Sequence, residues 1–538
     1  MSEKMIAAGV AVAIGMAPAC STPMPAQPPA PVMSSHYLDQ KIDWKPCFDP
    51  RDLPKGVPVG SGRLEYGSYV VPRDWLRPDT RDELTIAVSR LRPATGEPKG
   101  TLLTNPGGPG VPGRSMPLLF LRAARTTLLD NMEVIGVDVR GTGGSTNVSC
   151  GEYPDLALDP RDQSRGNLDL LRGSNDLHAR FCQAKSGEFG QYITTEQTVR
   201  DFDLLRHLLG RQKVNWLGYS GGTWLGAYYA TYFPNRVGRF VFDSVMDVTG
   251  SWEDDQLGAP AGFERRFRGD FTPWVARYDQ QYRLGATSEA VRQSYEHVRA
   301  KLTEQPVRLP QGEPIDAMAL DSTLIQAMYD KHYFPHAAEY LSALRAVVDR
   351  PAVDPGDPEI GTALAQLAEL TPALRAILGR LIGGVAPFGV NLDSWMATQW
   401  SIKCNDTPAH GWDDNLAALQ GLSSAYPLRG SHVLWPCSSW QRPQTRLETP
   451  TGQGIPPVLL VQSVNDPSTP RAGAERTHRT FANSRLLTVT EEGDHGIYAN
   501  GNDCVDKIVE SFLVDGVTPE QDLTCQGMPL PEPNRAER

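Results

Sequence analysis

The chain has 538 residues, of which 40% are hydrophobic and 21% are charged, and its formal net charge at pH 7 is -11. This composition excludes a disordered chain, and the surplus of acidic residues argues against a nucleic-acid partner. The length allows one large domain with an insertion, or two domains.

The first segment resembles a secretory signal peptide. Lys4 precedes a short apolar stretch that ends in the small residues "APAC" at 17–20, so we predict residues 1–19 as a signal peptide and an extracellular location for the mature chain. Lipidation of Cys20 is an alternative that would anchor the chain to the outer face of the cell membrane. Residues 20–38 read as a Pro-rich tether.

Three β-branched-rich segments each end in a glycine turn, at 100–110, 132–145 and 213–222. The third is followed by an apolar and aromatic helix that ends near Pro234, and then by a further strand at 237–245. Strand, helix and strand in this order predict an α/β fold with a parallel sheet.

The pattern then becomes mainly helical over residues 246–450, which we interpret as an inserted cap. Apolar strand segments return within 456–470 and 484–498. The expected organisation is therefore a core formed by 39–245 and 451–538, with the cap between its two parts.

The turn Gly218-Tyr219-Ser220-Gly221-Gly222 joins a predicted strand to a predicted helix. A G-x-S-x-G turn holds a serine in a strained conformation above the sheet, at a helix N-terminus whose N–H groups stabilise negative charge. Ser220 is therefore the candidate nucleophile. A glycine turn that only connects the two elements is the alternative.

A serine hydroxyl needs a base, and the base needs an acid that fixes its tautomer. Asp466 follows the first returning strand and His495 follows the next, so the chain order Ser220, Asp466, His495 is that of a hydrolase triad. Asp243, at the end of the strand after the serine helix, is the alternative acid. Asp494 adjoins His495, but neighbouring residues on an extended segment point in opposite directions.

The oxyanion hole requires the N–H that follows the nucleophile and a second N–H from an earlier loop. Gly221 offers the first, and the loop "NPGGPG" at 105–110 offers Gly107 and Gly108 for the second. A plain β-turn is the alternative for this loop.

The eight cysteines fit an oxidising compartment. Apart from Cys20 they are odd in number, and pairing of sequence neighbours leaves Cys47 unpaired, although Cys47 could instead take Cys150 or Cys182. None has the close spacing of a zinc site, so we predict structural disulfides and no metal. The predicted pairs are Cys150 with Cys182, Cys404 with Cys437, and Cys504 with Cys525.

A series of motifs resembles the secreted tripeptidyl aminopeptidases of actinomycetes, within the prolyl aminopeptidase group of α/β hydrolases. The motifs are "NPGGPG", "GVDVRGTGGS", "GYSGGTWLGAYYATYFPNRV", "SIKCND", "NDPSTP" and "GDHGIY", and the resemblance spans about 40–525. It implies an α/β-hydrolase fold, a mostly parallel sheet flanked by helices with a large helical cap. It also implies a serine exopeptidase with Ser220 as nucleophile, Asp466 as acid and His495 as base.

Two departures from that family matter. Its members often carry a cysteine just before the segment that reads "VVP" here, within 64–72, and the absence of that cysteine would leave Cys47 unpaired. Asn105 stands where prolyl members have histidine, as in the tripeptidyl branch. The first departure leaves the substrate length open.

An aminopeptidase must bind a protonated amine, for which acidic groups in the cap are the natural partners. Solvated surface charges and helix caps are the alternative reading of these groups. The candidate substrate-binding residues are Glu253, Asp254, Asp255, Asp406, Tyr219 and Trp252.

The sequence therefore predicts an exopeptidase that acts on a peptide or peptide-like substrate through an acyl-enzyme and needs no cofactor. One alternative is an esterase or amidase of a small molecule or natural product, because a fold does not fix a substrate. The other is a non-catalytic surface-binding protein on a hydrolase scaffold. The oligomeric state stays open.

Overall fold

The computed structural model describes residues 34–533, apart from 50, 52, 152–157, 310–313, 351–357, 382–387, 390, 433–435 and 446. The predicted signal peptide, Cys20 and most of the Pro-rich tether lie outside the described residues. Within the described ranges, no helix is long and apolar enough to cross a membrane.

One ten-stranded sheet forms the centre of the molecule, in the order β1-β2-β3-β5-β4-β6-β7-β8-β9-β10. The pairs from β1 to β5 along this order are antiparallel, and every later pair is parallel. This confirms the predicted α/β fold with a mostly parallel sheet. The strands are β1 (Lys45–Pro46), β2 (Leu64–Pro72), β3 (Glu83–Leu91), β4 (Gly100–Asn105), β5 (Met132–Val137), β6 (Val214–Tyr219), β7 (Val237–Asp243), β8 (Val458–Ser463), β9 (Ser484–Thr490) and β10 (Leu523–Gln526).

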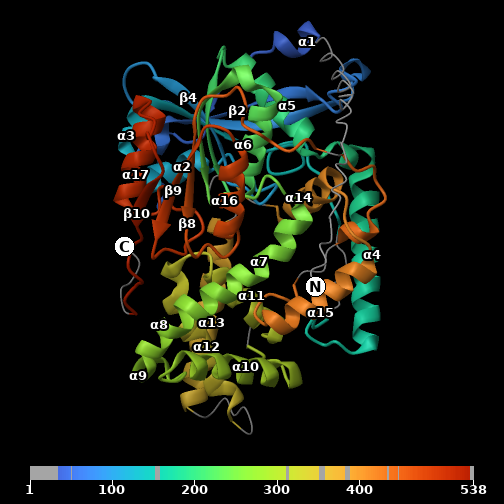
Figure 1. Ribbon diagram of the computed structural model, residues 1–538, viewed down its shortest axis with the longest axis vertical. Coiled ribbons are helices and arrows are strands. Elements are labelled where there is room, and N and C mark those ends of the chain that lie inside the picture. The colour runs from blue at the N-terminus through green and yellow to red at the C-terminus, as the bar shows by residue number, and fades with distance from the viewer. Residues whose placement is uncertain are drawn as a thin grey trace, which may run out of the picture.

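Helices cover both faces of this sheet (Figure 1), and every residue of β5 and β8 is buried as a result. One face packs against α5 (Thr195–Leu208), α6 (Gly221–Tyr232) and α16 (Arg471–Thr480). The other face packs against α2 (Met116–Arg122), α3 (Thr126–Asn131) and α17 (Asp503–Glu510). α6 ends just before Pro234, whose ring and missing N–H cannot continue a helix.

A helical body lies beyond one end of the sheet and has an apolar core of its own (Figure 1). Ser251 and Asp254 close a capping box at its first helix. The helices of this body are α7 (Trp252–Arg266), α8 (Thr272–Arg277), α9 (Asp279–Tyr282), α10 (Ser288–Glu304), α11 (Ala317–Ala327), α12 (Phe334–Val348) and α13 (Pro358–Leu381).

The next two helices are α14 (Leu392–Asp406) and α15 (Trp412–Ala425). α14 falls within the range predicted as cap, yet Ala397, Ile402 and Cys404 pack into the core on one face of the sheet. It therefore belongs to the layer next to the sheet and not to the apolar core of the helical body.

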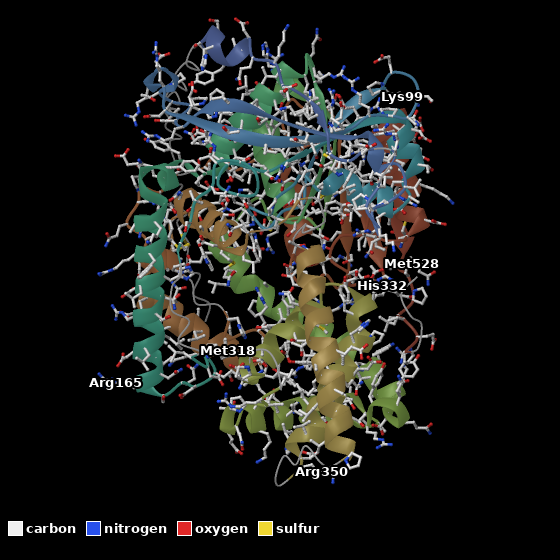
Figure 2. The ribbon with its side chains drawn as sticks, turned by 180° about the vertical axis from the view of Figure 1, so that it is seen from behind. Lys99, Arg165, Met318, His332, Arg350 and Met528 are labelled. Carbon is white, nitrogen blue, oxygen red and sulfur yellow. A yellow bond between two sulfur atoms is a disulfide. The ribbon has the colours of Figure 1, made fainter. Side chains whose placement is uncertain are left out.

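Three disulfides join the cysteine pairs suggested by sequence order, and Cys47 is free. Cys150–Cys182 fastens α4 (Arg165–Ser186) to the segment that follows β5. α4 runs along one side of the molecule, and Arg165 marks its end farthest from the sheet (Figure 2). The bridges thus hold long connections against the core.

Candidate active site

The candidate nucleophile lies in a sharp turn between β6 and α6. Ser220 has φ 52° and ψ -124°, a strained conformation for a residue with a side chain. Gly222 allows this turn to pack against the end of β4, because a Cβ there would lie 2.5 Å from the Asn105 carbonyl oxygen. The half-buried serine side chain makes no capping bond to α6.

The candidate base and acid lie on the loops that follow β9 and β8. His495 Nδ1 lies 3.0 Å from both carboxylate oxygens of Asp466. The Asp466 side chain is fully buried, and its Oδ1 accepts main-chain N–H groups from Ser468 at 2.9 Å and Thr469 at 2.8 Å. The acid is therefore fixed before it orients the imidazole.

Electrostatics favour a charged imidazole at this position. Burial alone would lower the pKa of His495, but the charge of Asp466 and its hydrogen bond raise that pKa above its usual value. The pair can thus stabilise the imidazolium that forms when a serine proton is taken.

The candidate oxyanion hole is formed by the turn after β6 and the loop after β4. A Cβ on Gly107 would lie 2.4 Å from the Tyr219 carbonyl oxygen, so the two loops approach as closely as glycine permits. The Gly107 N–H already donates to Asn105 Oδ1 at 2.9 Å. Gly221 and Gly108 therefore remain as the candidate donors, whereas the N–H of Gly107 is already used within the loop.

An apolar pocket opens beside Gly221 and Asn105. Most of its lining is apolar, with few groups that could hydrogen-bond a ligand. Its other lining residues are Pro109, Gly110, Val139, Thr195, Thr198, Trp224, Leu225, Trp252 and Ile402.

Three of the four acidic substrate-binding candidates are bonded to other groups of the chain, which makes them less suited to bind a substrate. Glu253 accepts hydrogen bonds from the main chain and ring of His410. Asp254 belongs to the capping box of α7, and Asp406 is fully buried and accepts from the N–H and hydroxyl of Thr195.

Asp255 has a different environment. Its half-buried carboxylate accepts no hydrogen bond from the described residues and interacts electrostatically with His495, Lys403 and Arg429. Burial raises the pKa of Asp255 to about 6, while Lys403 and Arg429 act in the opposite direction. The Lys403 ammonium lies 5.9 Å from the centre of the Trp252 ring and 5.7 Å from that of the Trp400 ring.

The two aromatic candidates have structural contacts. The Tyr219 hydroxyl donates to the Tyr498 carbonyl oxygen at 3.0 Å, which ties the serine turn to the histidine loop. Trp252 lines the apolar pocket and its Nε1 lies 3.4 Å from Asp406. Both residues therefore shape the site from its walls.

The cap contacts His495 and Asp466 in ways that the sequence did not predict. The His495 N–H donates to the Tyr329 carbonyl oxygen at 2.8 Å, and the rings of these two residues meet edge to face. The Arg265 guanidinium donates to the main-chain oxygen of Asp466 at 3.1 Å. A main-chain acceptor can be any residue type, so the sequence could not single out Tyr329.

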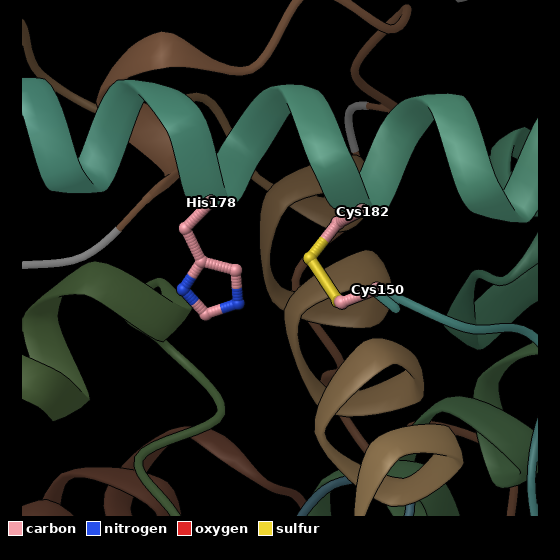
Figure 3. Close-up of side chains that lie close together, drawn as sticks. All are labelled: Cys150, His178 and Cys182. Carbon is pink, nitrogen blue, oxygen red and sulfur yellow. A yellow bond between two sulfur atoms is a disulfide. The ribbon is translucent and has the colours of Figure 1, made fainter. Parts of the chain in front are cut away.

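Two clusters have the residue types of a metal site. Cys150, His178 and Cys182 lie together (Figure 3), but both sulfurs belong to one disulfide and offer no thiolate ligand. In the second cluster, with Asp330 and His332, the Asp494 carboxylate accepts from Lys331 and Arg266. Neither arrangement is suited to a metal, because its ligand atoms are already bonded.

Comparison with known proteins adds relatives along nearly the whole chain. Residues 100–328 match the family description "alpha/beta hydrolase fold" and residues 426–525 match "TAP-like protein". The chain is 30% identical over 507 residues to a tripeptidyl aminopeptidase of Streptomyces lividans, covering 91% of this chain and 88% of the relative.

Two mycobacterial relatives are more distant. Serine protease Hip1 of Mycobacterium tuberculosis is 26% identical over 515 residues, with 92% of each chain covered. Carboxylesterase B of Mycobacterium tuberculosis is 28% identical over 471 residues, with 85% of each covered.

Proposed function

The chain belongs to the tripeptidyl aminopeptidase family of α/β hydrolases and is a serine exopeptidase, and we propose that Ser220, His495 and Asp466 carry its reaction. The observation that supports this assignment most strongly is the symmetric contact of His495 Nδ1 with both oxygens of Asp466, at 3.0 Å each. Ser220 lies on the neighbouring strand-to-helix turn.

The reaction follows from these positions. Ser220 Oγ attacks the scissile carbonyl while His495 takes its proton, and Asp466 stabilises the resulting imidazolium. The N–H groups of Gly221 and Gly108 hold the oxyanion, and His495 returns the proton to the leaving amine. Water then hydrolyses the acyl-enzyme by the same steps.

Substrate recognition is the finer part of the proposal. Asp255 is suited to bind the free N-terminal ammonium of a peptide, since its carboxylate lacks a hydrogen-bond partner among the described residues and interacts with His495. The apolar pocket beside Gly221 would take a side chain next to the cleaved bond. By analogy with the Streptomyces relative, the released product is a tripeptide.

Ester hydrolysis is a second candidate. The same nucleophile and pocket would accept an ester carbonyl, and one relative is named carboxylesterase B. An ester needs no ammonium group, so Asp255 would then be dispensable. The named activities of the relatives favour catalysis over a non-catalytic surface-binding role.

Export is the proposed location, because three disulfides fit an oxidising compartment. The intact mass of the mature N-terminus tests this: cleavage after Ala19 supports a signal peptide, and a lipid mass on Cys20 supports anchoring. An uncleaved N-terminus on protein from the native host contradicts export.

Labelling with a fluorophosphonate, followed by peptide mapping, tests the assignment of the nucleophile. Such a probe reacts with a serine that has been activated by a base. We expect one labelled peptide, carrying the adduct on Ser220, and slow labelling in His495→Ala. An adduct on another serine would overturn the assignment.

A further inference from the structure

Asp243 ends β7, between the strand that carries Ser220 and the strand that leads to Asp466. The side chain is fully buried. Its main-chain oxygen accepts the N–H of Ser220 at 3.0 Å. The main chain of Asp243 is therefore hydrogen-bonded directly to that of the candidate nucleophile.

The carboxylate of Asp243 binds the loop that carries His495. It accepts the N–H of Ile497 at 3.1 and 3.0 Å through its two oxygens, and that of Tyr498 at 2.7 Å. The next residue, Ser244, accepts the Gly496 N–H at 2.7 Å. Three successive N–H groups after the histidine are thus held by two residues at the end of β7.

The first part of the same loop is held from the cap. His495 itself donates to the Tyr329 carbonyl oxygen. The preceding Asp494 is fixed by the main-chain N–H of Lys331 at 2.8 Å and by Arg266 at 2.5 Å. If the Asp243 carboxylate were lost, the loop would stay attached at 494–496 but its N–H groups at 497 and 498 would lose their acceptor, so His495 would shift while the fold persists.

The charge at Asp243 fits this arrangement. Burial raises the pKa of Asp243 to about 7, whereas the N–H groups of Tyr498 and Ile497 and the nearby His495 oppose the shift. Asp466 and Tyr219 are the other titratable groups that interact with it. The carboxylate gains its shorter hydrogen bonds from main-chain donors and a longer one, at 3.4 Å, from the Ser244 hydroxyl, and the imidazole pairs with Asp466.

We propose that Asp243 is a positioning residue that fixes the separation of Ser220 and His495, by binding the nucleophile turn through its main chain and the histidine loop through its carboxylate. This inference rests on the proposed function. It goes beyond it, since it gives a role to a residue outside the Ser-His-Asp set.

Asp243→Asn and Asp243→Ala separate positioning from an acid role. An asparagine oxygen at the place of Oδ2 can accept both N–H groups, so we expect Asp243→Asn to keep kcat within about tenfold of wild type. Asp243→Ala should lower kcat about 100-fold with KM nearly unchanged, because a displacement near 1 Å costs about that much. Fluorophosphonate labelling should slow in parallel.

Asp203→Ala is the stability control. Asp203 is a buried carboxylate on α5 that pairs with Arg206 and accepts from the Tyr229 hydroxyl at 3.2 Å, and among the described residues it has no hydrogen bond to either catalytic loop. This variant should lower the melting temperature and leave kcat unchanged. Ser244→Ala removes the bond to Gly496 and the weak hydrogen bond from the Ser244 hydroxyl to Asp243 at 3.4 Å, but keeps the bonds of Asp243 to Ile497 and Tyr498. It provides a milder test should Asp243→Ala fail to fold, with kcat expected to fall several-fold.

Two results would overturn the inference. Equal damage from Asp243→Asn and Asp243→Ala, with a shifted pH profile, would assign Asp243 an acid role. An unchanged kcat in Asp243→Ala, or in Ser244→Ala if only that variant folds, would leave Asp243 a purely structural role. Failure of the proposed function is distinguishable, because the wild-type enzyme would then not label at Ser220.

Discussion

Asp466 presents both of its carboxylate oxygens to His495 Nδ1 at the same distance, 3.0 Å. The main-chain N–H groups of Ser468 and Thr469 hold the carboxylate in place. The alternative acid, Asp243, accepts with its carboxylate the main-chain N–H groups of Ile497 and Tyr498, which follow the histidine. These contacts support the proposed roles, Asp466 as the acid that orients the imidazole and Asp243 as a positioning residue.

Asp466→Asn should lower kcat about 10⁴-fold, because an amide favours the wrong tautomer of the imidazole while leaving its position intact. Steady-state kinetics of the wild-type enzyme and the variant, on one peptide and one aryl ester, measure this loss in kcat. A smaller loss than in Asp243→Asn would contradict the assignment of the acid.

The pH profile of kcat/KM should rise as His495 loses its proton. The pKa of His495 is raised above its usual value by Asp466, and only the neutral imidazole can act as a base. Activity is therefore absent below that raised pKa and appears as the pH increases through it. In Asp466→Asn the rising limb should move to lower pH, and an unmoved limb would argue against the pairing.

Asp255→Asn should raise KM for peptides with free N-termini by about 10-fold to 100-fold, since a hydrogen bond to a charged group contributes about 1.5–3 kcal/mol. Hydrolysis of an aryl ester without an amine should not change. Asp254→Asn is the matched control, because this neighbouring carboxylate is exposed and caps α7. Equal effects of the two variants on KM would contradict the ammonium site.

The ammonium site should also depend on pH. Burial raises the pKa of Asp255 to about 6, so its carboxylate binds a cation only above that range. KM for free peptides should therefore increase as the pH falls below about 6 and stay constant in Asp255→Asn. A KM that is flat with pH in the wild-type enzyme would count against Asp255.

Gly222→Ala should reduce activity and stability together. The added Cβ would lie 2.5 Å from the Asn105 carbonyl oxygen, so the loop with Gly108 must move away from the serine turn. Gly258→Ala is the control, because a Cβ there meets no atom within 4 Å and alanine favours a helix by about 1 kcal/mol. Unfolding in urea and kcat report the two effects, and an active Gly222→Ala enzyme would contradict the close packing.

Replacing both Cys404 and Cys437 by serine should cost about 2–4 kcal/mol of unfolding free energy, because their disulfide closes a loop across 33 residues. Cys47→Ser should have little effect, since that thiol is free and half-buried. Urea unfolding of the two variants measures the difference. Equal stability would imply that the bridge is not formed.

The central strands could be predicted because each one is a short apolar run that ends in a glycine turn. β4, β5 and β6 lie within the predicted segments. The antiparallel strand β2 was not predicted, because Gly67 and Ser68 interrupt its pattern and its alternate residues are exposed at the edge of the sheet. The two-residue β1 is too short to show the alternation of apolar and polar residues that indicates a strand.

The site could be predicted as far as chemistry imposes residue types. A nucleophile, a base and an acid need specific side chains in a fixed order, and the proposed triad of Ser220, His495 and Asp466 follows that order. Glu253 and Asp406 carry the same charge as Asp255, and only tertiary contacts separate their roles. Asp243 binds the histidine loop through main-chain N–H groups. Because nearly every residue type supplies such a group, the sequence does not indicate this contact.

The measurement that tests the central claim most directly is mass-resolved cleavage of matched peptides with free and N-acetylated termini, by the wild-type enzyme and by Ser220→Ala. The account predicts release of tripeptides from the free peptides alone, with a loss of at least about 10⁴-fold in the variant. Cleavage of acetylated peptides at an equal rate, or hydrolysis of an aryl ester with all peptides intact, would contradict it.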